Sequence, residues 1–224
     1  MTALLELDDV GYRYPHRKNE RGDVLRGVSL TVAAGEAVGI VGSNGSGKST
    51  LLKVLATLLR PTRGRVLFRG VPVARSLRAY RAGLNYCAGA PQGFYPRLTA
   101  EENLRFSSGM KGRMLSRGEI AALLDRVGLT ESGDVTYARF SLGMRQRLHL
   151  AAVLFEPATV WILDEPTNGL DSDGMALLQG LLGEAGGRVA RVVVSHDADF
   201  LSRVVDRTLH LRDGKVMCSS SRSS

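Results

Sequence analysis

The chain has 224 residues, which is enough for one large domain or for a domain that carries a small inserted one. Hydrophobic residues make up 44% and charged residues 23%, as in globular proteins, and the longest apolar runs fall far short of the ~20 residues of a membrane-spanning helix. The net charge is +8, but the positive charges look scattered and are not interleaved with aromatic residues, so we expect no nucleic-acid partner.

The first third of the chain is predicted to be rich in strands. Apolar alternation and glycine turns indicate these strands, whereas leucines at helical spacing indicate a helix that Pro61 ends. In chain order, we predict strands at 4–15, 25–36 and 36–42, a helix at 48–59, and a pair of short strands within 64–73.

The middle of the chain is predicted to be mostly helical, and the last part alternates strands and helices. In chain order, we predict helices at 98–110, 116–129 and 141–155, a strand at 159–165, a helix at 173–185, a strand at 188–196, a helix at 198–207 and a hairpin at 207–216. Continuous apolar strands that alternate with helices indicate an α/β fold with a parallel sheet covered on both faces.

One stretch matches a phosphate-binding loop. The residues "GSNGSGKST", from Gly42 to Thr50, fit the pattern G-x-x-x-x-G-K-[ST] and lie between an apolar strand and an amphipathic helix. Glycines let the backbone N–H groups converge on the β- and γ-phosphates. Lys48 adds a point charge, and the Ser49 hydroxyl can ligate Mg²⁺. The residues predicted to bind the nucleotide here are Gly42, Ser43, Asn44, Gly45, Ser46, Gly47, Lys48, Ser49 and Thr50.

Two later strand ends carry polar groups suited to phosphate chemistry. "VWILDEP" places two carboxylates at the carboxyl end of a buried strand, where ligands of parallel sheets bind. Alone, such a pair could also face solvent or cap a helix. Beside a phosphate loop, Asp164 suits a Mg²⁺-linked carboxylate and Glu165 suits the general base for an attacking water. His196, after the next strand, could hydrogen-bond the γ-phosphate and tie it to Glu165.

A second candidate anion site lies about a hundred residues after the first. In "FSLGMRQRL", small residues precede a predicted helix, whose first N–H groups are free and lie at the positive end of the helix dipole. Ser141 and Gly143 are the residues there that can donate to a γ-phosphate. One ATP-sized ligand does not need two such sites within one chain.

The order of these motifs resembles the nucleotide-binding subunit of an ATP-binding cassette (ABC) transporter. The resemblance spans roughly residues 3 to 216 and rests on "GSNGSGKST", "FSLGMRQRL" shortly before "WILDEP", then "TNGLD" and "SHD". It implies a RecA-like P-loop NTPase core, an N-terminal antiparallel β subdomain and an α-helical subdomain inserted at 93–152. Residues 1–216 would then form a single domain, and 217–224 would be a disordered tail.

The resemblance also implies roles for individual residues. In this family the signature motif contacts the ATP held by another subunit, which explains the second anion site at Ser141 and Gly143. The family pattern is LSGGQ, and Leu142 and Met144 depart from it. The implied roles are adenine stacking by Tyr14, with Tyr12 as the alternative, contact across the dimer interface by Asp171, and Mg²⁺ and water sensing by Gln92, which lies closer to "YPRLT" than the family spacing.

The resemblance finally implies cofactors and partners. We expect ATP and Mg²⁺, a homodimer or heterodimer of nucleotide-binding subunits, and a separate transmembrane permease. The protein would lie peripherally on the cytoplasmic face of the membrane and hydrolyse ATP to power transport, with the chain most similar to exporters. The alternatives are a soluble ABC-type ATPase of a non-transport machine and a nucleotide-dependent binding module with little hydrolysis, against which an intact Glu165 and His196 argue.

Overall fold

A computed structural model describes residues 3–15, 22–91, 93–110, 112–154 and 157–217. The chain forms two compact units, which are described separately. Unit 1 comprises 1–86, 158–165 and 182–224, and unit 2 comprises 87–157 and 166–181. Within the described part of the chain, no helix combines the length and the apolar character that crossing a membrane requires.

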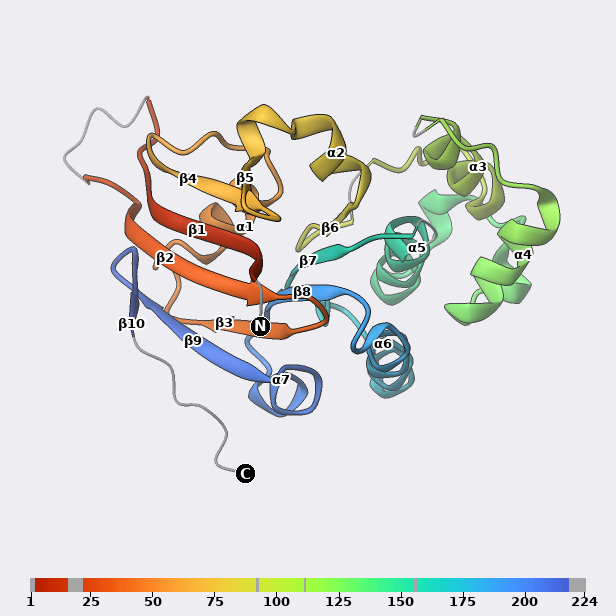
Figure 1. Cartoon of the computed structure of the whole chain (residues 1–224). Coiled ribbons are helices and arrows are strands. Elements are labelled where there is room, and N and C mark those ends of the chain that lie inside the picture. The colour runs from red at the N-terminus through yellow and green to blue at the C-terminus, as the bar shows by residue number, and fades with distance from the viewer. Residues whose placement is uncertain (1–2, 16–21, 92, 111, 155–156, 218–224) are drawn as a thin grey trace. The chain divides into compact units, whose positions relative to one another are not determined.

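Unit 1 contains a four-stranded antiparallel sheet (Figure 1). Its strands are β1 (Ala3–Tyr12), β2 (Leu25–Ala33), β4 (Arg63–Phe68) and β5 (Val71–Pro72), in the order β2-β1-β4-β5. β1 pairs antiparallel with both β2 and β4, so it lies at the centre of this sheet. The pairing of β4 with β5 confirms the predicted pair of short strands.

The second sheet has six strands in the order β10-β9-β3-β8-β7-β6. They are β3 (Ala37–Val41), β6 (Leu84–Cys87), β7 (Val160–Asp164), β8 (Ala190–Val194), β9 (Arg207–Arg212) and β10 (Lys215–Met217). Parallel pairing joins β9 to β3, β3 to β8 and β8 to β7, while β10 forms an antiparallel edge. The carboxyl ends of β3, β7 and β8 therefore lie along the same edge of the sheet.

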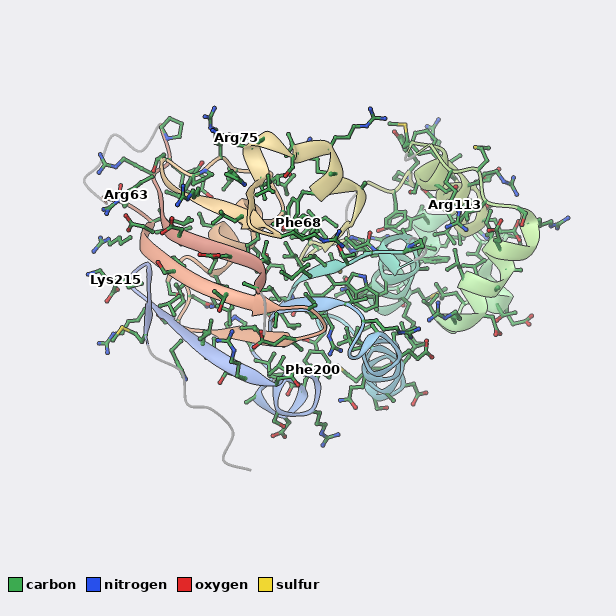
Figure 2. All side chains as sticks on the ribbon, in the orientation of Figure 1. Arg63, Phe68, Arg75, Arg113, Phe200 and Lys215 are labelled. Atoms are coloured by element: carbon green, nitrogen blue, oxygen red, sulfur yellow. The ribbon has the colours of Figure 1, made fainter. Side chains whose placement is uncertain are left out.

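One hydrophobic core joins both sheets to helix α1 (Lys48–Leu55). It contains Leu5 and Val28 from the antiparallel sheet, Ile40 from the parallel sheet, and Leu51 and Leu55 from α1, all fully buried. In Figure 2 the side chains labelled Phe68 and Phe200 lie inside unit 1, whereas Arg63 and Lys215 lie at its outside. Burial of these apolar side chains holds the loop before α1 in place.

The prediction for the end of α1 was wrong. The helix was expected to continue to Leu59, but it ends at Leu55, because Thr57 adopts a left-handed backbone with φ of 59°. Three further elements had no prediction: the 3-10 turn η1 (Val73–Arg75), helix α2 (Leu77–Ala82) and strand β6. Helix α7 (Ala198–Val204) begins at Asp197, whose side chain accepts a hydrogen bond from Phe200 N–H.

Unit 2 is mainly helical. Its helices are α3 (Ala100–Met110), α4 (Arg117–Arg126) and α5 (Leu142–Leu154), with the 3-10 turns η2 (Thr130–Ser132) and η3 (Tyr137–Arg139) and the first turns of α6 (Ser172–Ala185). A capping box starts α4, in which Ser116 and Glu119 satisfy each other's free backbone N–H groups. The predicted helical insert at 93–152 lies within this unit.

The predicted class, an α/β fold with an antiparallel N-terminal sheet and inserted helices, is confirmed. β10 includes Met217, which the prediction placed in the disordered tail, and residues 218–224 lie outside the described residues. Gln92 also lies outside the described residues, so its role stays a prediction.

Unit 2 buries an imidazole, which should make stability depend on pH. Burial lowers the pKa of His149, on α5, to about 4, below the ordinary value of 6.5. As pH falls below 6.5, His149 therefore takes up a proton in the unfolded chain but stays neutral in the folded chain. This difference lowers the free energy of unfolding between pH 6.5 and 4 by up to about 3 kcal/mol. Urea titrations across this range should show a shallower pH dependence in His149→Gln than in a control, His210→Gln, at an exposed position.

Candidate active site

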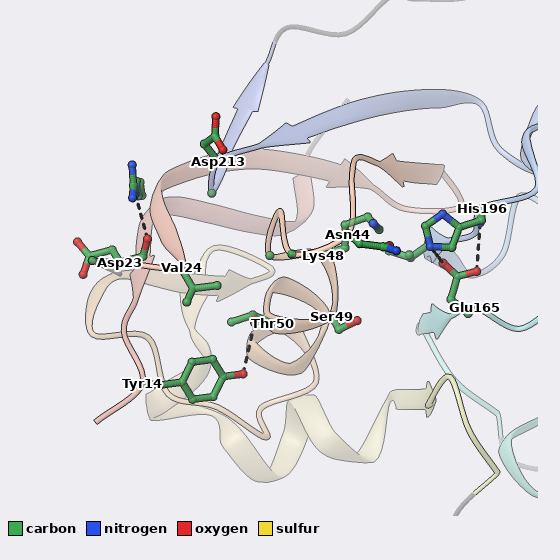
Figure 3. A pocket seen from close by; sticks show the side chains of 16 residues that line it. Tyr14, Asp23, Val24, Asn44, Lys48, Ser49, Thr50, Glu165, His196 and Asp213 are labelled. Carbon is green, nitrogen blue, oxygen red and sulfur yellow. Dashed lines mark hydrogen bonds and ion pairs between the residues drawn. The ribbon is translucent and has the colours of Figure 1, made fainter. Parts of the chain in front are cut away.

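A pocket of about 850 Å³ opens where β3, β7 and β8 end, and every residue that lines it belongs to unit 1 (Figure 3). The loop of residues 44–50 forms one wall, and Glu165, Val194 and His196 form another. The lining residues are Tyr14, Gly22, Asp23, Val24, Arg26, Asn44, Gly45, Gly47, Lys48, Ser49, Thr50, Glu165, Val194, His196, Asp213 and Gly214. This volume suits a ligand the size of a nucleotide.

The predicted phosphate loop has the backbone that such a loop needs. Gly45 and Gly47 have φ of 79° and 108°, a region that side chains with a Cβ rarely adopt. A Cβ on Gly47 would lie 3.0 Å from the Val24 carbonyl oxygen, so the chain also lacks room for one. α1 begins at Lys48 with no side-chain cap, which leaves its first N–H groups available to an anion.

The loop also holds polar groups that suit a phosphate. Lys48 is buried, and its Nζ donates to the carbonyl oxygens of Gly42, at 2.6 Å, and Ser43, at 3.2 Å. The buried Ser46 hydroxyl has no hydrogen-bond partner among the described residues. An anion bound here would offset the desolvation cost of this buried cation, whose hydrogen bonds among the described residues go to neutral carbonyl oxygens.

Ser49 and Asp164 form an oxygen pair that fits a magnesium ion. The Ser49 hydroxyl lies 3.4 Å from Asp164 Oδ1, and Asp164 ends strand β7. Burial raises the pKa of Asp164, an effect that the hydrogen bond from Ser49 and the nearby lysines oppose. A buried carboxylate beside a hydroxyl favours a small hard cation, which would offset the desolvation of the carboxylate.

Glu165 lies beside His196 at the mouth of the pocket. His196 N–H donates to Glu165 Oε2 at 3.1 Å, and His196 Nε2 lies 3.3 Å from Oε1. The Glu165 side chain is 14% exposed, and its Oε1 makes no hydrogen bond of good geometry within the described chain. Glu165 also has φ of 47°, an unfavourable backbone for this residue type that is typical of functional sites. Glu165 lines the pocket, so its carboxylate is placed to orient a water there and to accept a proton from it.

The structure separates the two tyrosines proposed for adenine stacking. Tyr14 lines the pocket and its hydroxyl lies 3.3 Å from Thr50 Oγ1, at the start of α1. Tyr12 is only 6% exposed and belongs to the hydrophobic core, where it meets the Tyr14 ring edge-on at 4.9 Å. Of the two, Tyr14 is the one that a bound base can reach.

Seven residues of the pocket wall had no predicted role: Gly22, Asp23, Val24, Arg26, Val194, Asp213 and Gly214. The turn between β9 and β10 reaches the phosphate loop, since Gly214 N–H donates to Ser46 O at 3.1 Å and Arg26 N–H donates to Gly214 O at 2.8 Å. Asp213 follows the loop by more than 160 residues, so only the pairing of β9 with β3 brings them together.

Ser141, Gly143 and Asp171 belong to unit 2 and do not line the pocket. The Ser141 hydroxyl accepts from Met144 N–H at 3.2 Å and caps α5, which keeps its own proton free to donate. Asp171 forms an ion pair with Arg147 at 2.5 Å and accepts a hydrogen bond from Gly174 N–H at 2.8 Å. Both bonds lower the pKa of Asp171, and the bond from Gly174 has the larger effect. Gln146, fully buried, donates to Pro166 O at 3.1 Å. The start of α5 thus holds the segment 166–171 by several bonds.

Leu142, which departs from the family signature, packs on this same segment. A Cβ on Gly169 would lie 2.6 Å from Leu142 Cγ, and a Cβ on Gly143 would lie 2.9 Å from Gly169 O. The backbones at Gly143 and Gly169 therefore approach each other closely, while Leu142 remains 60% exposed.

Gly169→Ala should destabilise this segment. Gly169 has φ of 75°, and an added methyl group would meet Leu142, so we expect a loss of about 1–2 kcal/mol in the free energy of unfolding. The control is Gly180→Ala, on α6, where a Cβ would meet nothing within 4 Å and should stabilise the helix by up to about 1 kcal/mol. Equal effects in urea unfolding would contradict the close approach at Gly169.

Comparison with known proteins finds one family over most of the chain. Residues 25–168 match the family described as ABC transporter. The cytochrome c biogenesis ATP-binding export protein CcmA of Methylococcus capsulatus is 41% identical over 164 residues, which cover 72% of this chain and 79% of that protein. The pyoverdine export ATP-binding/permease protein PvdT of Pseudomonas fluorescens is 34% identical over 99% of this chain, which spans only 35% of that longer protein.

Solved structures agree with this family. The dimeric structure of the ATP-binding cassette MJ0796 in a post-hydrolysis state, bound to ADP and phosphate, has a TM-score of 0.84 and 28% sequence identity. The similarity covers 98% of this chain and 100% of that one.

Proposed function

Because this chain belongs to the ABC transporter family and is an ABC-type ATPase, we propose that it binds MgATP in the unit 1 pocket and uses hydrolysis to power transport through a separate membrane protein. The observation that carries the proposal is that the phosphate loop, Glu165 and His196 line one pocket, and that Asp164 contacts this loop through Ser49. These residues come from three separate segments of the chain, and chance rarely brings such groups together around one cavity.

In this proposal the loop of 42–50 holds the β- and γ-phosphates. Its N–H groups and Lys48 donate to the phosphate oxygens, and Tyr14 supports the base. Ser49 and Asp164 would hold Mg²⁺, which supplies positive charge at the phosphate oxygens. The Glu165 carboxylate would orient the attacking water and take its proton, and His196 would hold Glu165 and contact the γ-phosphate.

A second copy, or a homologous subunit, would complete the site. Ser141 and Gly143 lie outside the wall of this pocket, so we propose that they donate to the γ-phosphate held by the other subunit. Asp171 would contact the same interface. Two identical subunits would form two equivalent sites related by a two-fold axis. ATP then stabilises the closed pair, and loss of the γ-phosphate lets it open.

We propose that the transport is export and that the protein lies on the cytoplasmic face of the membrane. CcmA and PvdT, which resemble this chain, both carry export in their names. The helical insert at 93–152 and the loop before it would dock the membrane partner. Gln92 would sense Mg²⁺ in that loop.

Co-purification distinguishes transport from the alternative, a soluble ABC-type ATPase of another machine. The protein with an affinity tag is recovered from solubilised membranes, and its bound partners are identified. We expect a polytopic membrane protein that raises the ATPase rate when added back in lipid. Recovery of a soluble complex with no membrane protein, and with an equally stimulated ATPase, would favour the alternative.

A further inference from the structure

A long segment of the chain, most of it in unit 1, has positive charge with no acidic residue to balance it. Between Glu36 and Glu101 the sequence contains Lys48, Lys53, Arg60, Arg63, Arg65, Arg69, Arg75, Arg78, Arg81 and Arg97, and no Asp or Glu. Positive residues are little denser here than elsewhere in the chain, but the absence of acidic residues concentrates the excess positive charge in this segment. Nucleotide binding accounts for Lys48 alone.

The fold brings five of these arginines to neighbouring elements: Arg60, Arg69, Arg75, Arg78 and Arg81, called here the arginine face. Helix α2 lies against the end of α1, since Tyr80 OH donates to Leu55 O at 2.8 Å and Arg81 Nε donates to Thr57 Oγ1 at 2.8 Å. The rings of Tyr80 and Phe68 lie 5.1 Å apart, which places β4 beside α2. The segment after α1, the β4–β5 turn, η1 and α2 are thus adjoining parts of unit 1, and Figure 2 labels Arg75 there.

The arginine face is exposed and its charges are not neutralised. All five side chains belong to exposed residues. Arg63 and Arg65, close by on β4, pair with Asp9 and Asp8 of β1, whereas no ion pair joins the five to any acidic group in the described part of the chain. Arg69 instead lies over the Phe68 ring at 5.1 Å, and Arg81 donates to Thr57. Such uncompensated charge fits an anionic partner.

Exposed aliphatic side chains lie among these arginines. Leu58 is 59% exposed, Val71 is 46% exposed and Leu77 is 39% exposed. Each of them is within two residues of an arginine of the face. Basic groups interspersed with exposed aliphatic groups match the interface of a bilayer, where phosphates lie above acyl chains.

We propose that the arginine face binds the headgroups of anionic phospholipids. This inference rests on the proposed placement of the protein at a membrane. Single-stranded nucleic acid fits less well, because stacking on its bases needs exposed aromatic side chains and the two aromatic residues of this region, Phe68 and Tyr80, are 8% and 0% exposed. Lipid binding would hold the cassette beside its membrane partner independently of nucleotide.

Vesicle flotation with the whole purified protein tests the proposal. The vesicles contain phosphatidylcholine alone or phosphatidylcholine with phosphatidylglycerol. We expect binding only to the anionic vesicles, release by high salt, and about 100-fold weaker binding after Arg69→Gln, Arg75→Gln and Arg78→Gln are combined. The matched control removes three exposed charges elsewhere, with Arg117→Gln, Arg203→Gln and Lys215→Gln, and should keep most of the binding.

ATP turnover, measured on the same samples, separates this inference from the proposed function. The arginine variant should hydrolyse ATP like the unmodified protein, since none of its three positions lines the pocket. Equal vesicle binding by both triple variants, or binding of polyglutamate or duplex DNA but not of anionic vesicles, would overturn the lipid assignment and leave the ATPase intact. Vesicle binding by a protein that hydrolyses no ATP would refute the function and not this inference.

Discussion

Replacement of Glu165 by Gln should lower ATP turnover by about 10²–10⁴-fold, the range expected for loss of a general base. Gln keeps the shape of the side chain and an oxygen that can accept from His196 N–H, which now lies 3.1 Å from Glu165 Oε2. It removes only the basicity of Oε1, the oxygen that lacks a good hydrogen bond. ATP binding should therefore survive, and the γ-phosphate should remain in place.

The second part of this prediction is a trapped dimer. If ATP holds two subunits together and cannot be hydrolysed, Glu165→Gln should elute as a dimer in MgATP and as a monomer in ADP. Light scattering on the column measures both species. The matched control is Glu131→Gln, an identical change at an exposed position of unit 2. Normal ATP turnover by Glu165→Gln would show that Glu165 is not the general base.

Replacement of Lys48 by Ala should weaken ATP binding by about 10–100-fold, because a charge-assisted bond to phosphate contributes more than a neutral one. Among the described residues, the buried Lys48 Nζ donates hydrogen bonds to the Gly42 and Ser43 carbonyl oxygens alone, and Lys48 lines the pocket. Turnover at saturating ATP should fall as well, since the same charge stabilises the transferring phosphoryl group.

Calorimetric titration with ATP measures the loss of affinity in the Lys48 variant. Lys215→Ala, at an exposed position of β10, removes the same charge and serves as control. Circular dichroism should show unchanged folding, because Lys48 makes no ion pair in the described chain. Unchanged affinity in a folded Lys48→Ala protein would place the phosphates elsewhere.

Local motifs were predictable from the sequence because their chemistry is local. The phosphate loop and the strand end at Asp164 each need only a few consecutive residues, and in unit 1 they lie in contact through Ser49 and Asp164. For adenine stacking we preferred Tyr14 to Tyr12 from the sequence, and the structure adds the physical difference between them: Tyr12 packs in the core and Tyr14 lines the pocket.

Features that depend on distant contacts had no sequence signal. Asp213 reaches the pocket through the pairing of β9 with β3, and the end of α1 at Leu55 follows from the left-handed backbone at Thr57. The contact of Leu142 with Gly169 likewise joins segments 27 residues apart. The packing role of Leu142, which departs from the family signature, is therefore visible only in the folded chain.

The central claim is that one subunit's phosphate loop works with the other subunit's Ser141. Mixing two inactive variants tests it: Lys48→Ala, which loses the loop, and Ser141→Asp, which keeps a cap for α5 but places a negative charge toward phosphate. In an equal mixture about half of the dimers are mixed pairs, and in each of these one of the two sites joins an intact loop to an intact Ser141. ATP turnover should therefore recover to about a quarter of the unmodified rate. A mixture that stays as inactive as its separate components would contradict the claim.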